Sequence, residues 1–312
     1  GGSATLVFYP GLDSIGDANL VVIAYNHIPS IDTIPIISSN GPYISYAYNT
    51  LNDSLGNNNQ MADYTEDILL TAFLTNNGTE NAVDVIANIS TSSPYLTLTD
   101  TTENYGTIAV DDTVGIYNGY RFTLADSVPD MTPLVFSMVA QDTSGQTYNM
   151  MFTVTAHAPN LQYLSYKVID TTGNGNGNGK LDPGETAGLN VYLVNAGSSE
   201  AYNVTGLLSG DGNWISIANS NMNYGNMAAG DTTMATYTIT ADGDTPLGYD
   251  AWFTMNINAD YGISATDQFS MVVGQRPIMI VKLAPTLSKD SLMACLDELS
   301  ISADTSGQIP TN

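Results

Sequence analysis

Residues 193–204 read LVNAGSSEAYNV, and residues 74–85 read LTNNGTENAVDV. Each stretch leaves an alternating apolar run, passes through an Asn- and Gly-containing turn and returns to alternation, which is typical of two β-strands joined by a turn. The two stretches are separated by 119 positions, since 204 minus 85 is 119, and this offset places Asn76 on Asn195. An internal repeat of β-structure is therefore predicted to organise most of the chain.

The same offset holds in both directions along the chain. Downstream it matches two dipeptides of the first copy with identical ones in the second, namely Tyr105-Gly106 with Tyr224-Gly225 and Asp112-Thr113 with Asp231-Thr232. Upstream it carries the Gly- and Asn-rich segment 56–66 onto 175–185. We therefore predict two domains, repeat one at residues 41–158 and repeat two at residues 159–275.

Short runs such as 68–74 and 189–194 are rich in β-branched and aromatic residues and are bounded by Gly, Asn, Asp or Pro. Many such runs recur at roughly 8–12-residue spacing without a helical period, which is the pattern of β-sandwiches. The predicted fold class is all-β, with each repeat forming one sandwich.

The two ends of the chain differ from the repeats. Residues 1–40 are predicted to be the end strands of a preceding domain. Residues 276–312 are predicted to start a further, incomplete domain with a β–α order, in which 278–283 forms a strand and 288–299 a helix whose leucines share one face. We therefore expect the chain to be a piece of a longer protein.

Composition restricts the possible partners. The chain of 312 residues has 31 Asp and Glu against 6 Lys and Arg, a formal net charge of −25. Such a charge repels phosphate backbones and anionic lipids and attracts divalent cations, so nucleic-acid binding is not expected. No apolar run approaches the ~18 residues that membrane insertion requires. The one cysteine cannot form an internal disulfide.

The segment 173–185, GNGNGNGKLDPGE, combines a flexible-looking run with a distinct ending. Counted from Asn174, it places oxygen-bearing residues at the positions of a twelve-residue calcium loop, with Gly at position 6 and Glu at position 12. The predicted Ca²⁺ ligands are Asp170, Asn174, Asn176, Asn178, the Lys180 carbonyl, Asp182 and Glu185. Leu181, at position 8, is expected to anchor the loop in the core. The alternative is a solvated Gly/Asn turn whose acidic residues are ordinary surface charges.

The corresponding segment of repeat one has lost part of this pattern, since Gln60 stands at the Gly position. Its oxygen-bearing residues define a weaker second candidate site, made of Asp53, Asn57, Asn59, Asp63 and Glu66. From the sequence, this loop is either a weaker calcium site or a remnant of one.

Catalytic candidates are few. Cys295, His27 and His157 could in principle form a nucleophile–base pair, but each is expected to be structural, and no catalytic motif stands out. We therefore predict no catalytic residues and no enzymatic activity for this chain. Trp214 and Trp252 are expected to fill the sandwich cores.

Residues 175–204, GNGNGKLDPGETAGLNVYLVNAGSSEAYNV, resemble a signature of β-sandwich modules attached to secreted peptidases of Bacteroidota. Residues 20–29, LVVIAYNHIP, are similar to the end of the immunoglobulin-like domain that follows the catalytic domain of gingipain-type cysteine peptidases. The catalytic Cys and His of that family have no matching motif in this sequence.

The resemblance implies tandem immunoglobulin-like β-sandwiches that bind calcium and belong to a secreted or cell-surface bacterial protein exported by a type IX route. The expected function is that of non-catalytic spacer or presentation modules, accessory to a gingipain-type peptidase, whose partners are other domains of the same protein. The alternative is an adhesin or extracellular filament subunit that self-associates or binds proteins or glycans through its sandwiches.

Overall fold

The computed structural model describes residues 16–22, 30–36, 40–171, 173–210, 212–274, 278–279 and 303–304. Within these ranges the regular structure is β-strand, apart from a 3₁₀ turn at Asp260–Gly262, so the all-β fold class is confirmed. No helix in this part of the chain is long and apolar enough to cross a membrane. The predicted helix at 288–299 lies outside the described residues, as do His27 and Cys295.

The chain divides into two compact units whose boundary differs from that of the sequence repeats. Unit 1 extends to Gln60 and also includes Asp67–Thr123 and Val135–Val154. Unit 2 contains Met61–Glu66, Leu124–Leu134 and the chain from Thr155 onward. Two short segments of repeat one thus belong to the same unit as repeat two.

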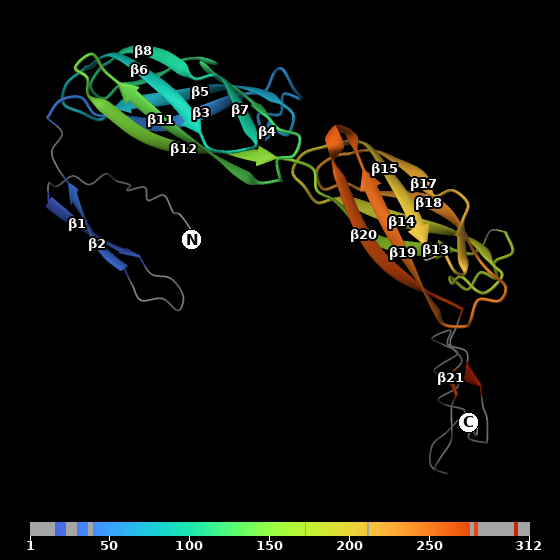
Figure 1. Cartoon of the computed structure of the whole chain (residues 1–312). Helices are drawn as coiled ribbons and strands as arrows, with labels where there is room; N and C mark the ends of the chain where they lie inside the picture. The colour runs from blue at the N-terminus through green and yellow to red at the C-terminus, as the bar shows by residue number, and fades with distance from the viewer. Residues whose placement is uncertain are drawn as a thin grey trace. The chain divides into compact units, whose positions relative to one another are not determined.

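Repeat two forms two four-stranded sheets (Figure 1). One has the order β13-β14-β18-β16, with bounds Leu161–Ile169, Thr186–Asn195, Thr232–Ala241 and Ile215–Ile217. The other has the order β17-β15-β19-β20, with bounds Asn221–Met227, Ala201–Gly210, Tyr249–Asn258 and Ser264–Val273. The first two strands pair in one sheet, while the third pairs with the last two in the other. This is the immunoglobulin-like arrangement of a β-sandwich.

Repeat one contributes two five-stranded sheets with a related order. The first is β3-β5-β10-β7 with β9 paired to β5, with bounds Ile44–Asn52, Asp67–Asn76, Tyr120–Leu124, Leu96–Asp100 and Thr113–Gly115. The second is β4-β12-β11-β6-β8, with bounds Ala62–Asp63, Thr147–His157, Thr132–Gln141, Ala82–Thr91 and Thr102–Ile108.

Two short strand pairs lie outside the sandwiches. β1 (Gly16–Val22) pairs antiparallel with β2 (Ser30–Ile36), and β21 (Ile278–Met279) pairs parallel with β22 (Ala303–Asp304).

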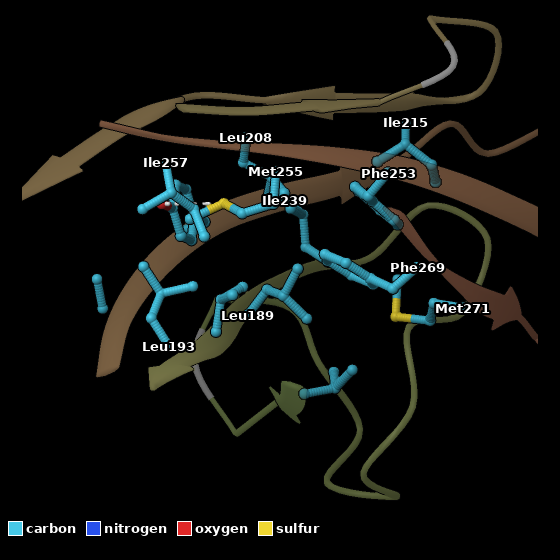
Figure 2. Packing of buried hydrophobic residues seen from close by; sticks show 14 of the residues in the cluster. Leu189, Leu193, Leu208, Ile215, Ile239, Phe253, Met255, Ile257, Phe269 and Met271 are labelled. Carbon is cyan, nitrogen blue, oxygen red and sulfur yellow. Dashed lines mark hydrogen bonds between the residues drawn. The ribbon is translucent and has the colours of Figure 1, made fainter. Parts of the chain in front are cut away.

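The core of repeat two follows from the period of 2 in its strands. In β14 every second residue, from Ala187 to Asn195, is buried. Figure 2 shows side chains from both sheets meeting in this core, among them Phe253 and Phe269, whose stacked rings have centroids 5.2 Å apart. Each fully buried side chain of this size contributes roughly 1.5–3 kcal/mol of transfer free energy.

The same alternation corrects the expectation for Trp252. Its neighbours Ala251 and Phe253 on β19 are buried, so Trp252 points outward and is 53% exposed. Period-2 register decides which face a residue occupies, whatever its size. Trp214 is only partly buried.

A buried asparagine closes each repeat at the end of its second long strand. The Oδ1 atom of Asn195 accepts the backbone N–H groups of Asn160 (3.0 Å) and Gly197 (3.1 Å). Its Nδ2 donates to the carbonyls of Ser199 (2.8 Å) and Met227 (3.0 Å). The carboxamide uses both its acceptor and its donor capacity, which permits complete burial of a polar side chain.

Asn76 makes the same four bonds in repeat one. It accepts the N–H groups of Tyr43 and Gly78, both at 3.0 Å, and donates to the carbonyls of Glu80 (2.8 Å) and Ile108 (3.0 Å). The sequence repeat is thus repeated at the level of single hydrogen bonds.

The glycine two positions after each asparagine allows this close approach. A Cβ atom on Gly197 would lie 2.3 Å from the Ala158 carbonyl oxygen, and one on Gly78 would lie 2.4 Å from that of Gly41. Only glycine lets the turn pack against the chain entering the sandwich. The Asn-x-Gly pattern therefore fixes the start of the first strand in both repeats.

Candidate metal site

The loop of repeat two connects adjacent, paired strands of one sheet. Asp170 comes directly after β13, and Glu185 directly precedes β14. Because these strands pair side by side, both ends of the loop are fixed by the sheet. Asp170 is 2% exposed and Glu185 is 7% exposed, so two carboxyl groups are buried at this end of the sandwich.

These two carboxyl groups bond to the loop's own backbone. Asp170 Oδ2 accepts the N–H of Gly179 at 3.0 Å. Glu185 accepts the N–H of Asn176 at Oε1 (3.1 Å) and that of Asp182 at Oε2 (2.9 Å). Neither forms an ion pair with Lys or Arg in the part of the chain that the structure describes. Their negative charge therefore meets only backbone dipoles.

Two asparagines extend this network around Asp182. The Nδ2 atoms of Asn176 and Asn178 each donate to Asp182 Oδ2 at 2.7 Å. Their Oδ1 atoms accept the backbone N–H groups of Asn178 (3.0 Å) and Lys180 (2.8 Å). The loop thus collects the oxygens of three carboxyl groups and two amides within a span of 16 residues, counted inclusively from Asp170 to Glu185.

Asn174, the predicted first ligand, has a different role in the structure. Its Oδ1 accepts the N–H of Thr186 at 2.8 Å, and its Nδ2 donates to the Gly184 carbonyl at 2.8 Å. Both polar atoms tie the start of the loop to its end. Asp170, which accepts the Gly179 N–H, instead occupies the head of the loop.

Leu181 anchors the loop in the core, as predicted. Its side chain is buried among the hydrophobic residues of repeat two. Its carbonyl accepts the N–H of Gly274 at 2.7 Å, just past the end of β20. The loop is therefore attached to the last strand of the sandwich as well as to β13 and β14.

In repeat one, Asp53 matches Asp170 in its bonding. It follows β3 directly, and its Oδ2 accepts the N–H groups of Asn59 (2.6 Å) and Gln60 (3.0 Å). Asp53 is 1% exposed, and its Oδ1 has no hydrogen-bond partner in the described structure. Asn57 Oδ1 accepts the Asn59 N–H at 3.0 Å, as Asn176 does for Asn178 in repeat two.

The remaining two residues of the second candidate site lie in the other compact unit, which begins again at Met61. There Glu66 Oε2 accepts the N–H of Asp63 at 3.3 Å, matching the bond between Glu185 and Asp182. Both side chains are buried. The structure therefore groups Asp53 with Asn57 and Asn59, and separately Asp63 with Glu66.

Acidic side chains alone do not complete a metal site. No group of three or more Asp, Glu, His or Cys side chains that could hold a metal ion occurs among the described residues. Calcium takes six to eight oxygen ligands and accepts carbonyl and amide oxygens as well as carboxylates. A cation in either loop would therefore need the Asn side chains and backbone carbonyls in its ligand set.

His157 belongs to a hydrogen-bonded chain that the sequence did not predict. Its Nδ1 lies 2.7 Å from Ser198 Oγ, and that hydroxyl also donates to Asp130 Oδ1. Burial opposes ionisation of Asp130, but bonds from Ser198 and from the Ala158 N–H outweigh it and lower its pKa. A catalytic triad requires His between Asp and Ser, whereas here Ser lies in the middle. These residues are far apart in sequence and carry no motif.

No protein-family model matches the sequence, and no curated protein is detectably similar to it. Three solved structures show limited likeness. Red sea bream transglutaminase is 12% identical with a TM-score of 0.29, over 77% of this chain and 32% of that one.

The other two are Escherichia coli alpha-2-macroglobulin in two states. The native conformation is 10% identical with a TM-score of 0.28, over 81% of this chain and 18% of that one. The form activated by porcine elastase is 11% identical with a TM-score of 0.26, over 83% and 24%. This chain thus covers less than two thirds of each of these proteins.

Proposed function

We propose that the loop at 170–185 binds Ca²⁺ and that the chain serves as a non-catalytic, calcium-stabilised β-sandwich spacer in a larger secreted or cell-surface protein. The observation that carries the proposal is the pair of buried carboxyl groups of Asp170 and Glu185, held at the ends of paired strands without a basic partner. Buried charge requires compensation, and a hard divalent cation supplies it through oxygen ligands.

The residues that would hold the ion are five side chains and one backbone carbonyl, namely Asp170, Asn176, Asn178, Asp182, Glu185 and the carbonyl of Lys180. An amide turned by 180° exchanges its oxygen and nitrogen, so Asn176 and Asn178 can offer oxygens where they now donate to Asp182. Bound calcium would offset the repulsion among the three carboxylates and order the loop. Asn174 is assigned a positioning role because its bonds join the two ends of the loop.

The spacer role rests on the architecture. Two repeats share one framework down to the bonds of Asn76 and Asn195, as expected of modules that set distance and rigidity. The net charge of −25 suits a soluble, cation-rich environment rather than nucleic acid. Association with a gingipain-type peptidase and type IX export rest on the sequence resemblance alone.

An adhesive role is the second candidate, and exposed aromatic side chains favour it. Trp252 and Tyr117 both project into solvent from the sandwich surfaces. Aromatic faces pack against the apolar faces of sugars, so a glycan would be the chemically matched ligand. Binding of the parent chain to a glycan array, lost in Trp252→Ala with an unchanged melting temperature, would support this role over a spacer role.

Calcium-dependent melting tests the leading proposal. The parent chain should melt at a higher temperature in millimolar calcium than in chelator, because ligand binding to the folded state alone adds stability. Glu185→Gln should lose most of that difference.

Glu80→Gln provides a matched control, since Glu80 is exposed and lies outside both loops. It should keep the full calcium response. A parent chain whose melting temperature is the same in calcium and chelator would contradict the proposal.

A further inference from the structure

Asp53 presents an unusual polar atom in repeat one. The residue is 1% exposed, and its Oδ1 makes no hydrogen bond within the described structure, although Oδ2 accepts two backbone N–H groups. Buried polar atoms are almost always paired, and an unpaired carboxyl oxygen is costly. Lys and Arg total 6 in the whole chain, and none of them pairs with Asp53. Some partner is missing from this position.

The loop around Asp53 keeps the backbone path of the loop in repeat two without its glycines. Asn58, Gln60 and Thr65 have φ values of 58°, 67° and 66°. The residues 119 positions later are all glycines with φ values of 81°, 77° and 83°, namely Gly177, Gly179 and Gly184. Left-handed backbone is unfavourable for non-glycine residues, above all for β-branched threonine. The path is thus retained in repeat one although its sequence no longer favours it.

We infer that the loop of repeat one is a second, independent divalent-cation site in which Asp53 Oδ1 is a direct ligand. Asn57 and Asn59 lie in the same group and supply further oxygens, and Asp63 and Glu66 complete the set that the sequence assigns to this loop. The inference does not rest on the calcium loop of repeat two, because the unpaired oxygen belongs to repeat one alone.

The chemistry favours a cation over water as the missing partner. Water would satisfy the hydrogen-bonding capacity of Oδ1 but would leave a buried acid uncompensated. A hard divalent cation satisfies the oxygen and the charge together, and Ca²⁺ accepts the mixture of carboxylate, amide and carbonyl oxygens that this loop contains. A site filled by water alone remains a distinguishable outcome of the experiments below.

Binding stoichiometry separates this site from the one in repeat two. Equilibrium dialysis or calorimetry with Ca²⁺ should give two ions per parent chain and one for Glu185→Gln. The doubly substituted chain, Asp53→Asn with Glu185→Gln, should bind none.

The outcomes of that titration are independent for the two sites. If Glu185→Gln abolishes all binding, repeat one has no site, while the proposed function stands. If Asp53→Asn removes one ion and Glu185→Gln removes none, repeat one binds calcium and the proposal for repeat two fails.

Stability in chelator distinguishes a ligand from a merely structural acid. Asp53→Asn should melt no lower than the parent in chelator, since it removes an uncompensated carboxyl group, and its stabilisation by calcium should be reduced. A lower melting temperature in chelator, with the parent's full calcium response, would overturn the inference and indicate a structural or water-filled site.

Asp142→Asn is the matched control for that comparison. Asp142 is equally buried in class, but its Oδ1 accepts from Ser144 and Gln146 and its Oδ2 from Tyr148. Because both oxygens are paired, this substitution should lower the melting temperature equally with and without calcium.

Discussion

Single residues with fully used hydrogen-bonding capacity hold each sandwich closed at the end where the chain enters. Asn195 and Asn76 each replace a stretch of regular pairing with four bonds to backbone groups that no strand could reach. A shorter or apolar side chain leaves those groups buried and unpaired. The energetic asymmetry of hydrogen bonds makes such positions sensitive, because an unmade bond costs more than a made bond contributes.

Asn195→Ala should therefore destabilise the chain by at least ~2 kcal/mol, since several buried backbone groups lose their partner at once. Urea unfolding of the second sandwich measures the change. Asn258→Ala serves as the control, because Asn258 is exposed, and it should stay within about 0.5 kcal/mol of the parent. Equal effects of the two substitutions would contradict the role assigned to Asn195.

Asp142 gives a prediction for acid. Burial opposes its ionisation, but bonds from Ser144, Tyr148 and the Gln146 backbone outweigh burial and lower its pKa below 3.8. Since the folded pKa is the lower one, the stability from this group is full above the unfolded pKa and declines as pH falls through the folded value. Unfolding followed from pH about 5 to about 2 should show this loss, and Asp142→Asn should flatten the curve. A parallel curve for the variant would exclude the assignment.

At the scale of elements, alternation was sufficient to predict most strands, and it also explains the error at Trp252, where size was given more weight than register. The candidate site was only partly predictable. An ungapped offset of 119 places Leu51 opposite Asp170, whereas the structure matches Asp53 with Asp170, an offset of 117 because 170 minus 53 is 117. A length difference between two loops cannot be seen in an ungapped comparison.

Contacts between distant segments were also beyond the sequence. The chain of bonds from His157 through Ser198 to Asp130 depends on which turns the fold brings together. The burial of Asp53 depends likewise on the loop path, since Asp is ordinarily a surface residue.

The two loops, which share a path but differ in sequence, should respond oppositely to glycine substitutions. Gly179→Ala forces a Cβ into left-handed backbone at φ +77° and should cost about 1–2 kcal/mol in chelator. Gln60→Gly relieves the same conformation in repeat one and should be neutral or slightly stabilising. Chemical denaturation of both variants in chelator provides the measurement, and a stabilising Gly179→Ala would show that the left-handed path is not required.

At the scale of the whole chain, repetition and acidity act together. Two related sandwiches each place a loop of oxygen-bearing residues after their first strand, and a net charge of −25 raises the local concentration of divalent cations around both. Calcium dependence is therefore expected to weaken at high ionic strength as the long-range field is screened.

The attachment of Gly274 to Leu181 has a mechanical consequence. The first strand of repeat two, β13, and the last, β20, belong to opposite sheets, and the chain enters at Leu161, at the end away from the loop that Gly274 contacts. A pulling force on the two ends of this sandwich therefore acts along the strands and strains many ladder bonds at once, since those bonds run perpendicular to the strands. An ion seated in the loop would fasten the exit point, so that traction from a neighbouring domain reaches the core through a clamp instead of a frayed end.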